Sequence, residues 1–413
     1  MSEEFDAIVI GAGAAGMFCA AHAARRGLRL ALLDHWPRLG EKIRISGGGR
    51  CNFTNREAHR IDRFEGENPA FARTALRAYP PARFLGRLAE RGIGWHEKHK
   101  GQLFCDDSSQ SIISMLRDDC DAAGVRWFRP VKVGAVERAV QESEARACRW
   151  RVRCEAGDLG ARSVVIATGG LSIPKVGASD LALRVARRLG LRVVPPRPAL
   201  VPLTFEPDAW RAFSDLAGVA LPVVVRAPAA SLAPAFEEDL LFTHRGLSGP
   251  AVLQISTFWR PGDPISIDLA AGRDLASALR EEKRTSRQQL STVLATLLPR
   301  RLAARWLADA RFAALASRRL AEVSDRDLAA LAAVLGDWWL VPSGSEGWRK
   351  AEVMAGGVAT DELDARSLQS HRAPGLHFIG EAVDITGWLG GYNFQWAWAS
   401  AYLAGEALAA SAA

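Results

Sequence analysis

The chain has 413 residues, of which 48% are hydrophobic and 24% charged, and its formal net charge is +7. This balance is typical of folded globular proteins and excludes the disordered and fibrous classes. The length exceeds what one compact core holds, so we expect two or three domains.

Arginine supplies most of the positive charge, and arginines gather between residues 273 and 326. They alternate there with Leu and Ala at helical spacing, which favours a solvated helix face over a nucleic-acid-binding stripe. We therefore do not expect nucleic acid as a partner. The six cysteines include no C-x-x-C pair and no His partner at zinc spacing, so we expect no metal site.

The N-terminal segment is acidic and leads directly into an apolar strand, without the basic region and cleavage site of a secretory signal. The sequence contains no run of about eighteen uncharged apolar residues, so we expect no membrane-spanning helix. A cytoplasmic protein with reduced thiols is the resulting expectation.

The first elements form a strand, a glycine-rich turn, a helix and a second strand. Residues 5–10 form an apolar strand, residues 11–16 read Gly-Ala-Gly-Ala-Ala-Gly, the helix runs to about residue 26, and residues 28–33 form the second strand. This is the length expected for a right-handed parallel crossover. The glycine-rich stretch 41–55 reads as a loop, and residues 69–92 and 107–124 have helical periodicity.

The remaining pattern indicates a second domain inserted into the first. A strand pair is expected near residues 126–136 and 150–154, and an apolar strand at 161–167 ends in Thr168-Gly169-Gly170. Prolines at 195, 196, 198 and 202 mark a domain crossing, after which short strands are expected at 221–225, 240–243 and 265–269. Residues 274–335 are helical in pattern, with Ser324 at a helix start. Residues 376–379 form a strand, and a helix begins near Gly391.

We therefore predict an α/β fold in which a Rossmann-type FAD-binding domain is interrupted by a β-rich domain that carries a helical insert. The predicted FAD-binding domain comprises residues 1–190 and 345–413. The β-rich domain comprises residues 191–272 and about 336–344, and the helical insert comprises residues 273–335.

The glycines at 11, 13 and 16 indicate a dinucleotide site. They provide a tight turn, close approach of the backbone to a pyrophosphate, and close packing of helix on strand. The start of the helix, at Ala14 and Ala15, presents free N–H groups to the phosphates. A carboxylate, Asp34, ends the second strand and is placed to accept hydrogen bonds from an adenosine ribose. FAD and NAD both use this unit, and the later motifs favour FAD.

A second glycine-rich segment reads Lys42-Ile-Arg-Ile-Ser-Gly-Gly-Gly-Arg-Cys-Asn-Phe-Thr-Asn55. Its glycines allow the backbone to lie against a flat ring or a phosphate, and its cationic side chains supply positive charge. With this segment the chain resembles the bacterial flavoproteins described as aminoacetone-oxidase-like, or YhiN-type, NAD(P)/FAD-dependent oxidoreductases. The resemblance continues through Val164-Val-Ile-Ala-Thr-Gly-Gly170, Leu241-Phe-Thr-His-Arg-Gly-Leu-Ser-Gly-Pro250, Ala355-Gly-Gly-Val358 and Gly380-Glu-Ala-Val-Asp-Ile-Thr-Gly-Trp-Leu-Gly-Gly-Tyr-Asn393.

The resemblance implies a split FAD site, with the second glycine-rich segment beside the flavin and the C-terminal segment closing over the ribityl chain and the ring. A helix starting at residue 391 would stabilise negative charge on the flavin pyrimidine. Related chains commonly have Glu where this chain has Asp34. The cofactor-binding residues expected from the motifs and the resemblance together are Gly11, Gly13, Ala14, Ala15, Gly16, Asp34, Lys42, Ser46, Gly47, Gly48, Arg50, Cys51, Asn52, Val133, Ala167, Thr168, Gly169, Gly170, Gly380, Glu381, Asp384, Gly391, Tyr392 and Asn393.

No catalytic side chain is assigned, because the flavin itself performs hydride chemistry. Cys51 lacks a second cysteine four or five residues on, so a packed thiol is favoured over a redox pair. His244 is either an acid or base near the substrate or part of a structural turn, and Trp388 and Trp396 either wall the substrate site or fill the core.

The leading functional hypothesis is an FAD-dependent oxidoreductase acting on a small organic molecule. No second glycine-rich strand–helix–strand unit is present for NAD(P)H. Either a nicotinamide docks transiently at the flavin, or the substrate reduces the flavin and oxygen reoxidises it. Two alternatives remain, a flavoprotein that acts on RNA and a non-catalytic flavin-binding protein that docks partners on its helical insert.

Overall fold

The computed structural model describes residues 3–139, 148–230 and 234–411. The chain divides into two compact units, here called unit one (Met1–Arg197 and Val353–Ala413) and unit two (Pro198–Glu352). Unit two is thus inserted into unit one. The chain leaves unit one along β11 (Val193–Ala199), whose last two residues belong to unit two, and returns to unit one at β19 (Val353–Val358), which pairs with β11.

The main sheet of unit one has the strand order β7-β2-β1-β10-β9-β8, and β20 also pairs with β10. Strands β7, β2, β1, β10 and β20 run parallel, and β9 and β8 add an antiparallel edge. Their bounds are β1 (Glu3–Ile10), β2 (Leu30–Leu33), β7 (Arg126–Phe128), β8 (Val133–Arg138), β9 (Trp150–Cys154), β10 (Gly157–Ile166) and β20 (Leu376–Phe378). The last four residues of β1 and all of β2 are buried, as expected for parallel strands covered on both faces.

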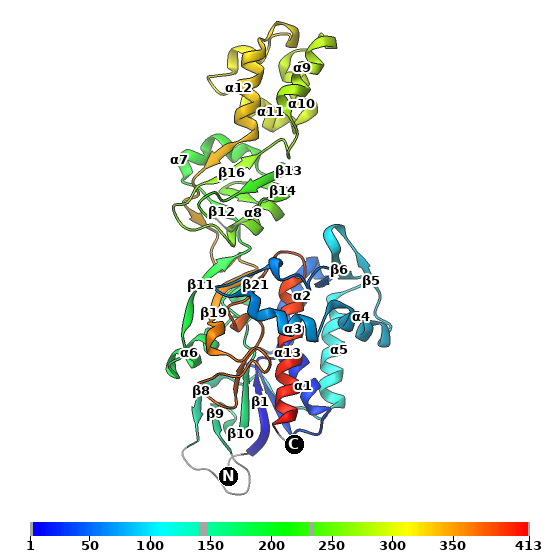
Figure 1. Ribbon diagram of the computed structural model, residues 1–413, viewed down its shortest axis with the longest axis vertical. Helices are drawn as coiled ribbons and strands as arrows, with labels where there is room; N and C mark the ends of the chain where they lie inside the picture. The colour runs from blue at the N-terminus through cyan, green and yellow to red at the C-terminus, as the bar shows by residue number, and fades with distance from the viewer. Residues whose placement is uncertain (1–2, 140–147, 231–233, 412–413) are drawn as a thin grey trace. The chain divides into compact units, whose positions relative to one another are not determined.

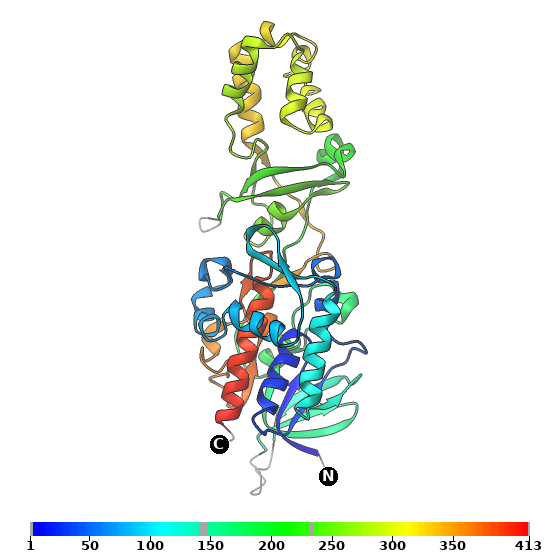
Figure 2. The same cartoon turned by 90° about the vertical axis from the view of Figure 1, so that its right-hand side faces the viewer.

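Three long helices of unit one lie side by side, with α1 between α5 and α13 (Figure 1). They are α1 (Ala14–Ala24), α5 (Ser109–Ala122) and α13 (Tyr392–Ala410). The same three helices are seen next to one another from the side in Figure 2. Shorter helices are α2 (Glu41–Ile45), α3 (Arg73–Ala78), α4 (Pro81–Glu90) and α6 (Leu181–Arg188).

Several predicted boundaries in unit one differ from the structure. The stretch expected to be a loop contains α2, a 3₁₀ turn at Ser46–Gly49 and β3 (Asn52–Asn55). Strand β3 joins β6 (Gln102–Cys105) and β5 (Trp95–Glu97) in a small antiparallel sheet that was not predicted. The helix expected over residues 69–92 is divided at Pro80 and Pro81, because proline removes a helical donor. The strand expected over 126–136 is two strands that pair with different neighbours, β2 and β9.

Unit two contains a sheet with the order β17-β16-β13-β14-β15-β12-β18. Its elements are β12 (Leu203–Thr204), α7 (Pro207–Trp210), β13 (Ala220–Arg226), β14 (Phe236–Thr243), β15 (Gly246–Ser248), α8 (Pro250–Ser256), β16 (Ile265–Asp268), β17 (Trp338–Leu340) and β18 (Gly344–Ser345). Four helices follow β16 and return to β17: α9 (Leu275–Thr285), α10 (Leu290–Leu297), α11 (Arg300–Leu307) and α12 (Asp325–Gly336). Ser324 caps α12 by accepting the Asp327 N–H at 3.1 Å.

Unit one also contains a short antiparallel pair of strands, β4 (Phe64–Glu65) and β21 (Thr386–Gly387).

Candidate dinucleotide and flavin site

The turn between β1 and α1 is packed so closely that two of its glycines cannot carry a side chain. A Cβ added to Gly16 would lie 1.8 Å from the Gly11 carbonyl oxygen, and one added to Gly11 would lie 2.4 Å from the Ala167 carbonyl oxygen. Gly11 also has a φ of +107°, which favours glycine. The fold itself therefore requires glycine at both positions.

Gly13 is different, because a Cβ added there would meet no atom within 4 Å. It is the N-cap of α1, and the helix has neither a side-chain cap nor an acidic residue in its first turn. The N–H groups at the start of an uncapped helix lack helical partners and attract anions. The open space at Gly13 and the N–H groups of Ala14 and Ala15 therefore form a cradle that fits a pyrophosphate.

Asp34 follows β2 and holds the glycine turn in place. Its carboxylate accepts the Ala12 N–H at 2.6 Å and the Trp36 N–H at 2.7 Å. This structural role was not foreseen from the sequence. A carboxylate has about four acceptor positions, so ribose binding by Asp34 stays a prediction. The Val131 N–H donates to the Asp34 carbonyl at 2.8 Å, which places Val133, at the start of β8, close to this end of the site.

The segment after β10 supplies an unsatisfied polar atom. Within the described residues, the buried hydroxyl oxygen of Thr168 has no hydrogen-bond partner. The Cα of Thr168 would lie 3.0 Å from a Cβ at Gly11, so this residue borders the turn. A buried hydroxyl without a partner costs free energy, which a polar group of a bound dinucleotide would recover. The residues present therefore fit the cofactor indicated by the motifs.

Lys42 and Glu381 form an ion pair that joins distant parts of unit one. The Lys42 Nζ lies 2.5 Å from Glu381 Oε2 and 2.5 Å from Ser172 Oγ. The other carboxylate oxygen, Oε1, accepts the Met354 N–H at 2.7 Å. Gly170 lies against the same carboxylate, since a Cβ there would be 3.1 Å from Glu381 Cδ. Ser172 and Met354 were missed from the sequence, and only their nearness to the Thr-Gly-Gly and Ala-Gly-Gly motifs could have indicated them.

Gly169 also faces this cluster, with a φ of +68°, and a Cβ added there would lie 3.6 Å from Glu381 Oε2. Gly380 precedes the glutamate, and its backbone is fixed by α13. Its N–H donates to Ser400 Oγ at 3.0 Å, and its carbonyl accepts the Trp396 indole N–H at 2.9 Å. Trp396 is 1% exposed, so it fills the core.

The second glycine-rich turn has a run of left-handed residues. The φ angles of Gly47, Gly48 and Gly49 are +57°, +66° and +87°. Ser46 Oγ donates to the Ile43 carbonyl at 2.8 Å, which anchors the start of the turn. A Cβ at Gly48 or Gly49 would meet nothing within 4 Å, so contacts within the protein do not explain these two glycines. Arg50, at the end of the turn, is exposed.

Cys51 is buried at the start of the strand that follows, with a φ of +50°. The pairing of β3 with β6 brings Cys105 beside it, a neighbour the sequence spacing did not reveal. Burial raises the pKa of the Cys51 thiol and raises the pKa of the Cys105 thiol to about 12. Thiols that stay protonated are poor nucleophiles, so both cysteines are suited to packing.

The start of α13 is tied to β3 and to the turn before it. Gly391 has a φ of +97°, and a Cβ there would lie 2.3 Å from the Thr54 carbonyl oxygen. Asn393 exchanges two hydrogen bonds of 2.8 Å with the backbone of Gly387. The Asn55 side chain donates to the Gly390 carbonyl at 3.0 Å. The second glycine-rich segment and the C-terminal helix are therefore held together.

Other predicted residues have structural partners in the same region. Asp384 Oδ2 accepts the Glu67 N–H at 2.8 Å, and burial raises the pKa of the Asp384 carboxyl. The rings of Tyr392 and Phe64 pack edge to face, with their centroids 5.9 Å apart. Burial raises the pKa of the Tyr392 hydroxyl to about 12. Asn52 lies in β3, paired with Phe104.

The two remaining candidates for a substrate role belong to different units. His244 is exposed in the two-residue turn between β14 and β15, in unit two, which agrees with the structural alternative. The Trp388 ring lies 4.2 Å from the Arg63 guanidinium in unit one.

Across the ranges that the structure describes, no three His, Cys, Asp or Glu side chains gather as metal ligands. No helix in these ranges combines the length and apolar character needed to cross a bilayer.

Comparison with known proteins identifies one family whose match covers nearly the whole chain. The family described as "HI0933-like protein Rossmann domain" matches residues 5–407. A protein of Escherichia coli (strain K12) named ribosomal RNA dihydrouridine synthase is 44% identical over 99% of both chains. A protein of Clostridium scindens named 3-dehydro-bile acid delta(4,6)-reductase is 28% identical over 97% of this chain and 98% of its own.

Among solved structures, the fold resembles a 3-ketosteroid delta1-dehydrogenase from Sterolibacterium denitrificans, with a TM-score of 0.50, 13% identity, and coverage of 99% of this chain and 100% of that one. The flavoprotein family expected from the motifs is confirmed, but the aminoacetone-oxidase description is not supported. The expectation that nucleic acid is not a partner also loses its support, because the Escherichia coli relative is named for an RNA product.

Proposed function

Because this chain belongs to the HI0933-like family of Rossmann-domain proteins, we propose that it reduces uridine to dihydrouridine in ribosomal RNA. The chain is an FAD-dependent oxidoreductase with a Rossmann-type α/β fold. The observation that carries the proposal is 44% identity over 99% of the chain to a ribosomal RNA dihydrouridine synthase. Such an RNA substrate would place the enzyme in the cytoplasm.

The residues proposed to bind FAD come from both the N-terminal and the C-terminal segment of unit one. The N–H groups of Ala14 and Ala15 would bind the pyrophosphate, and the Thr168 hydroxyl would complete the polar contacts there. The ion pair of Lys42 with Glu381 would border the ribityl chain. Once bound and reduced, FAD would supply a hydride, and the start of α13 would favour negative charge on a ring held beside it.

The overall reaction adds a hydride and a proton across the C5–C6 double bond of uridine, so it consumes two electrons. We propose NAD(P)H as the reductant, since its oxidation supplies the hydride and the remaining proton comes from solvent. Oxygen would take electrons away from the flavin, which is opposite to the direction needed. A transient nicotinamide site at the flavin agrees with the absence of a second glycine-rich nucleotide motif in the sequence.

The second candidate is reduction of a carbon–carbon double bond in a small molecule. It is favoured by the 28% identity to the Clostridium scindens reductase over 97% of the chain. Both named relatives carry out hydrogenation of a double bond, so the chemistry at the flavin would be shared. The two candidates differ in what the rest of the chain must bind, an extended polyanion or a compact apolar ligand.

The test is an anaerobic incubation of the yellow protein with NADPH or NADH and ribosomal RNA transcribed in vitro, which carries no modified nucleosides. We expect mass spectrometry of the digested RNA to show dihydrouridine at one or a few positions, and none with the protein omitted. Dihydrouridine absent from the RNA, together with reduction of an unsaturated 3-oxo bile acid, would instead support the second candidate.

A further inference from the structure

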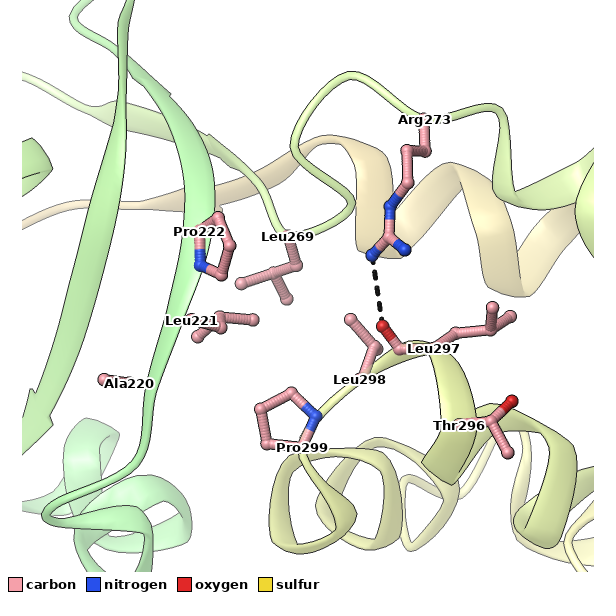
Figure 3. A pocket seen from close by; sticks show the side chains of 9 residues that line it. All are labelled: Ala220, Leu221, Pro222, Leu269, Arg273, Thr296, Leu297, Leu298 and Pro299. Carbon is pink, nitrogen blue, oxygen red and sulfur yellow. Dashed lines mark hydrogen bonds between the residues drawn. The ribbon is translucent and has the colours of Figure 1, made fainter. Parts of the chain in front are cut away.

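Unit two contains a pocket of about 190 Å³ between strand β13 and the junction of helices α10 and α11 (Figure 3). It is lined by Ala220, Leu221, Pro222, Leu269, Arg273, Thr296, Leu297, Leu298 and Pro299. None of these residues is acidic, and Arg273 is the single charged side chain among them. An anionic ligand would therefore meet a cation and no carboxylate at the wall of the pocket.

Arg273 directs its guanidinium toward the end of α10, as Figure 3 shows. Its Nη2 donates to the Leu297 carbonyl at 3.1 Å, and its Nε donates to the Ala270 carbonyl at 3.0 Å. Both acceptors are backbone carbonyls, and Leu297 is the last residue of α10, so the negative end of that helix dipole stabilises Arg273 without a carboxylate partner. A guanidinium has five N–H donors, and donors beyond these two contacts are available to a ligand.

Helix α11 begins directly after the pocket residue Pro299 and adds three more cations. Arg301 Nη1 donates to the Ala217 carbonyl at 3.5 Å, and Arg305 Nε donates to the Ala212 carbonyl at 2.6 Å. The Arg300 side chain is exposed, and within the part of the chain that the structure describes it makes no hydrogen bond or ion pair. These four arginines, Arg273, Arg300, Arg301 and Arg305, are called the arginine rim below.

Helix stability does not account for Arg300 and Arg301, whereas Arg305 lies in the last turn of α11, where the helix dipole favours a cation. Cations in the first turn of a helix oppose the positive end of its dipole, and α11 has two arginines there and no acidic residue. Of the acidic residues next to the rim in sequence, Asp274 caps α9 by accepting the Ser277 N–H at 3.0 Å. Asp309 pairs with Arg311 at 2.8 Å, which lowers the pKa of its carboxyl, and the charge of Arg305 makes a smaller contribution. Residues 273–335 contain twelve basic and seven acidic side chains, a net charge of +5 out of +7 for the whole chain.

We propose that the arginine rim binds the phosphate backbone of ribosomal RNA; this inference rests on the proposed function. Arginine contacts to phosphates position a nucleic acid without reading its sequence, and they make affinity depend on salt. The sequence pattern alone favoured a solvated helix face. The structure adds that part of this basic surface borders a pocket without acidic residues, and that the hydrogen bonds of its arginines go to neutral carbonyls.

The experiment compares three variants by filter binding to in vitro transcribed ribosomal RNA over a range of salt concentrations. The test variant is R300E/R301E, and R300K/R301K keeps the charge. The matched control is R284E/R287E, which reverses two exposed arginines of the same four-helix region that make no ion pair with any residue in the described ranges. We expect R300E/R301E to lower RNA affinity by about 10- to 100-fold near 0.1 M salt. The slope of log affinity against log salt concentration should become less steep by about 1.5.

The lysine variant is expected to bind within about threefold of the parent, because the phosphate contact is mainly electrostatic. The rate at which NADPH bleaches the flavin should stay unchanged in all variants, which shows that they are folded and that the rim does not bind the nicotinamide dinucleotide. An unchanged RNA affinity in R300E/R301E, or an equal loss in R284E/R287E, would overturn the proposal. If the parent protein forms no dihydrouridine, the proposed function fails, whereas the binding comparison still tests the rim.

Discussion

Residues 11–16 and residues 46–50 are both glycine-rich, but Gly11 and Gly16 of the first turn and Gly48 and Gly49 of the second have opposite surroundings. In the first turn, added Cβ atoms at Gly11 and Gly16 would collide with backbone oxygens of the protein. In the second turn, Gly48 and Gly49 face open space and adopt left-handed angles. The first turn is therefore shaped mainly by the packing of helix on sheet. The second is shaped by its backbone conformation and, on our proposal, by the flavin beside it.

The comparison predicts the largest effect for Gly16→Ala. Its Cβ would lie 1.8 Å from a backbone oxygen, so α1 must move away from β1. We expect a loss of about 3 kcal/mol in the free energy of unfolding and loss of bound FAD. Thermal unfolding and the ratio of flavin to protein absorbance measure both. Gly86→Ala, in open space on α4, is the control, which should leave bound FAD unchanged and raise the free energy of unfolding by about 1 kcal/mol, because alanine is favoured over glycine in a helix interior. A stable, yellow Gly16→Ala protein would contradict the packing argument.

Gly13→Val separates ligand binding from packing within the same turn. A Cβ at residue 13 would meet no protein atom within 4 Å, so we expect thermal unfolding of the flavin-free protein to change little. It would, however, fill the cradle at the start of α1, and we expect FAD affinity to fall by about 100-fold or more, giving colourless protein. Titration of the flavin-free protein with FAD measures this, with Gly86→Val as the matched control. Normal FAD occupancy would refute the assignment of the cradle.

Gly48→Ala should have the smallest effect and sharpens the account of the second turn. At a φ of +66°, alanine costs about 1 kcal/mol of strain, and its methyl group would point into the space assigned to the flavin side. We expect FAD affinity to fall about tenfold. Gly27→Ala carries similar strain at a φ of +89°, also in open space, and should leave FAD affinity unchanged. Equal FAD affinities for the two variants would place the flavin away from residue 48.

Elements with a strong local signal were predictable from the sequence. Strands β1 and β2 and helix α1 lie within about thirty residues and are bounded by glycines, and α13 begins one residue after the predicted Gly391. Strands β5 and β6 were missed because they have three and four residues and gain their stability from pairing across the small sheet. Sequence motifs therefore located most of the candidate site but not the framework that supports it.

The contacts within the site were less predictable than its members. Lys42 and Glu381 are 339 positions apart, and no periodicity relates them. Asp34 was assigned to a ribose, yet both of its oxygens already bind backbone N–H groups. The place of Cys105 beside Cys51 depends on the register of β3 with β6. These contacts join residues that are far apart in the sequence, so they depend on the tertiary structure and cannot be read from a local sequence pattern.

The ties between β3 and α13 have a consequence for biosynthesis. Thr54 Oγ1 donates to Gln395 Oε1 at 2.6 Å, and the Trp398 indole N–H donates to the Phe53 carbonyl at 2.9 Å. The N-terminal half of the site leaves the ribosome early, but these partners lie 341 and 345 positions further along the chain. Domains fold largely in the order of synthesis, so the nascent chain must wait, with its second glycine-rich turn unsupported, until unit two has been made. Loading of FAD is thus expected only after α13 has been synthesised.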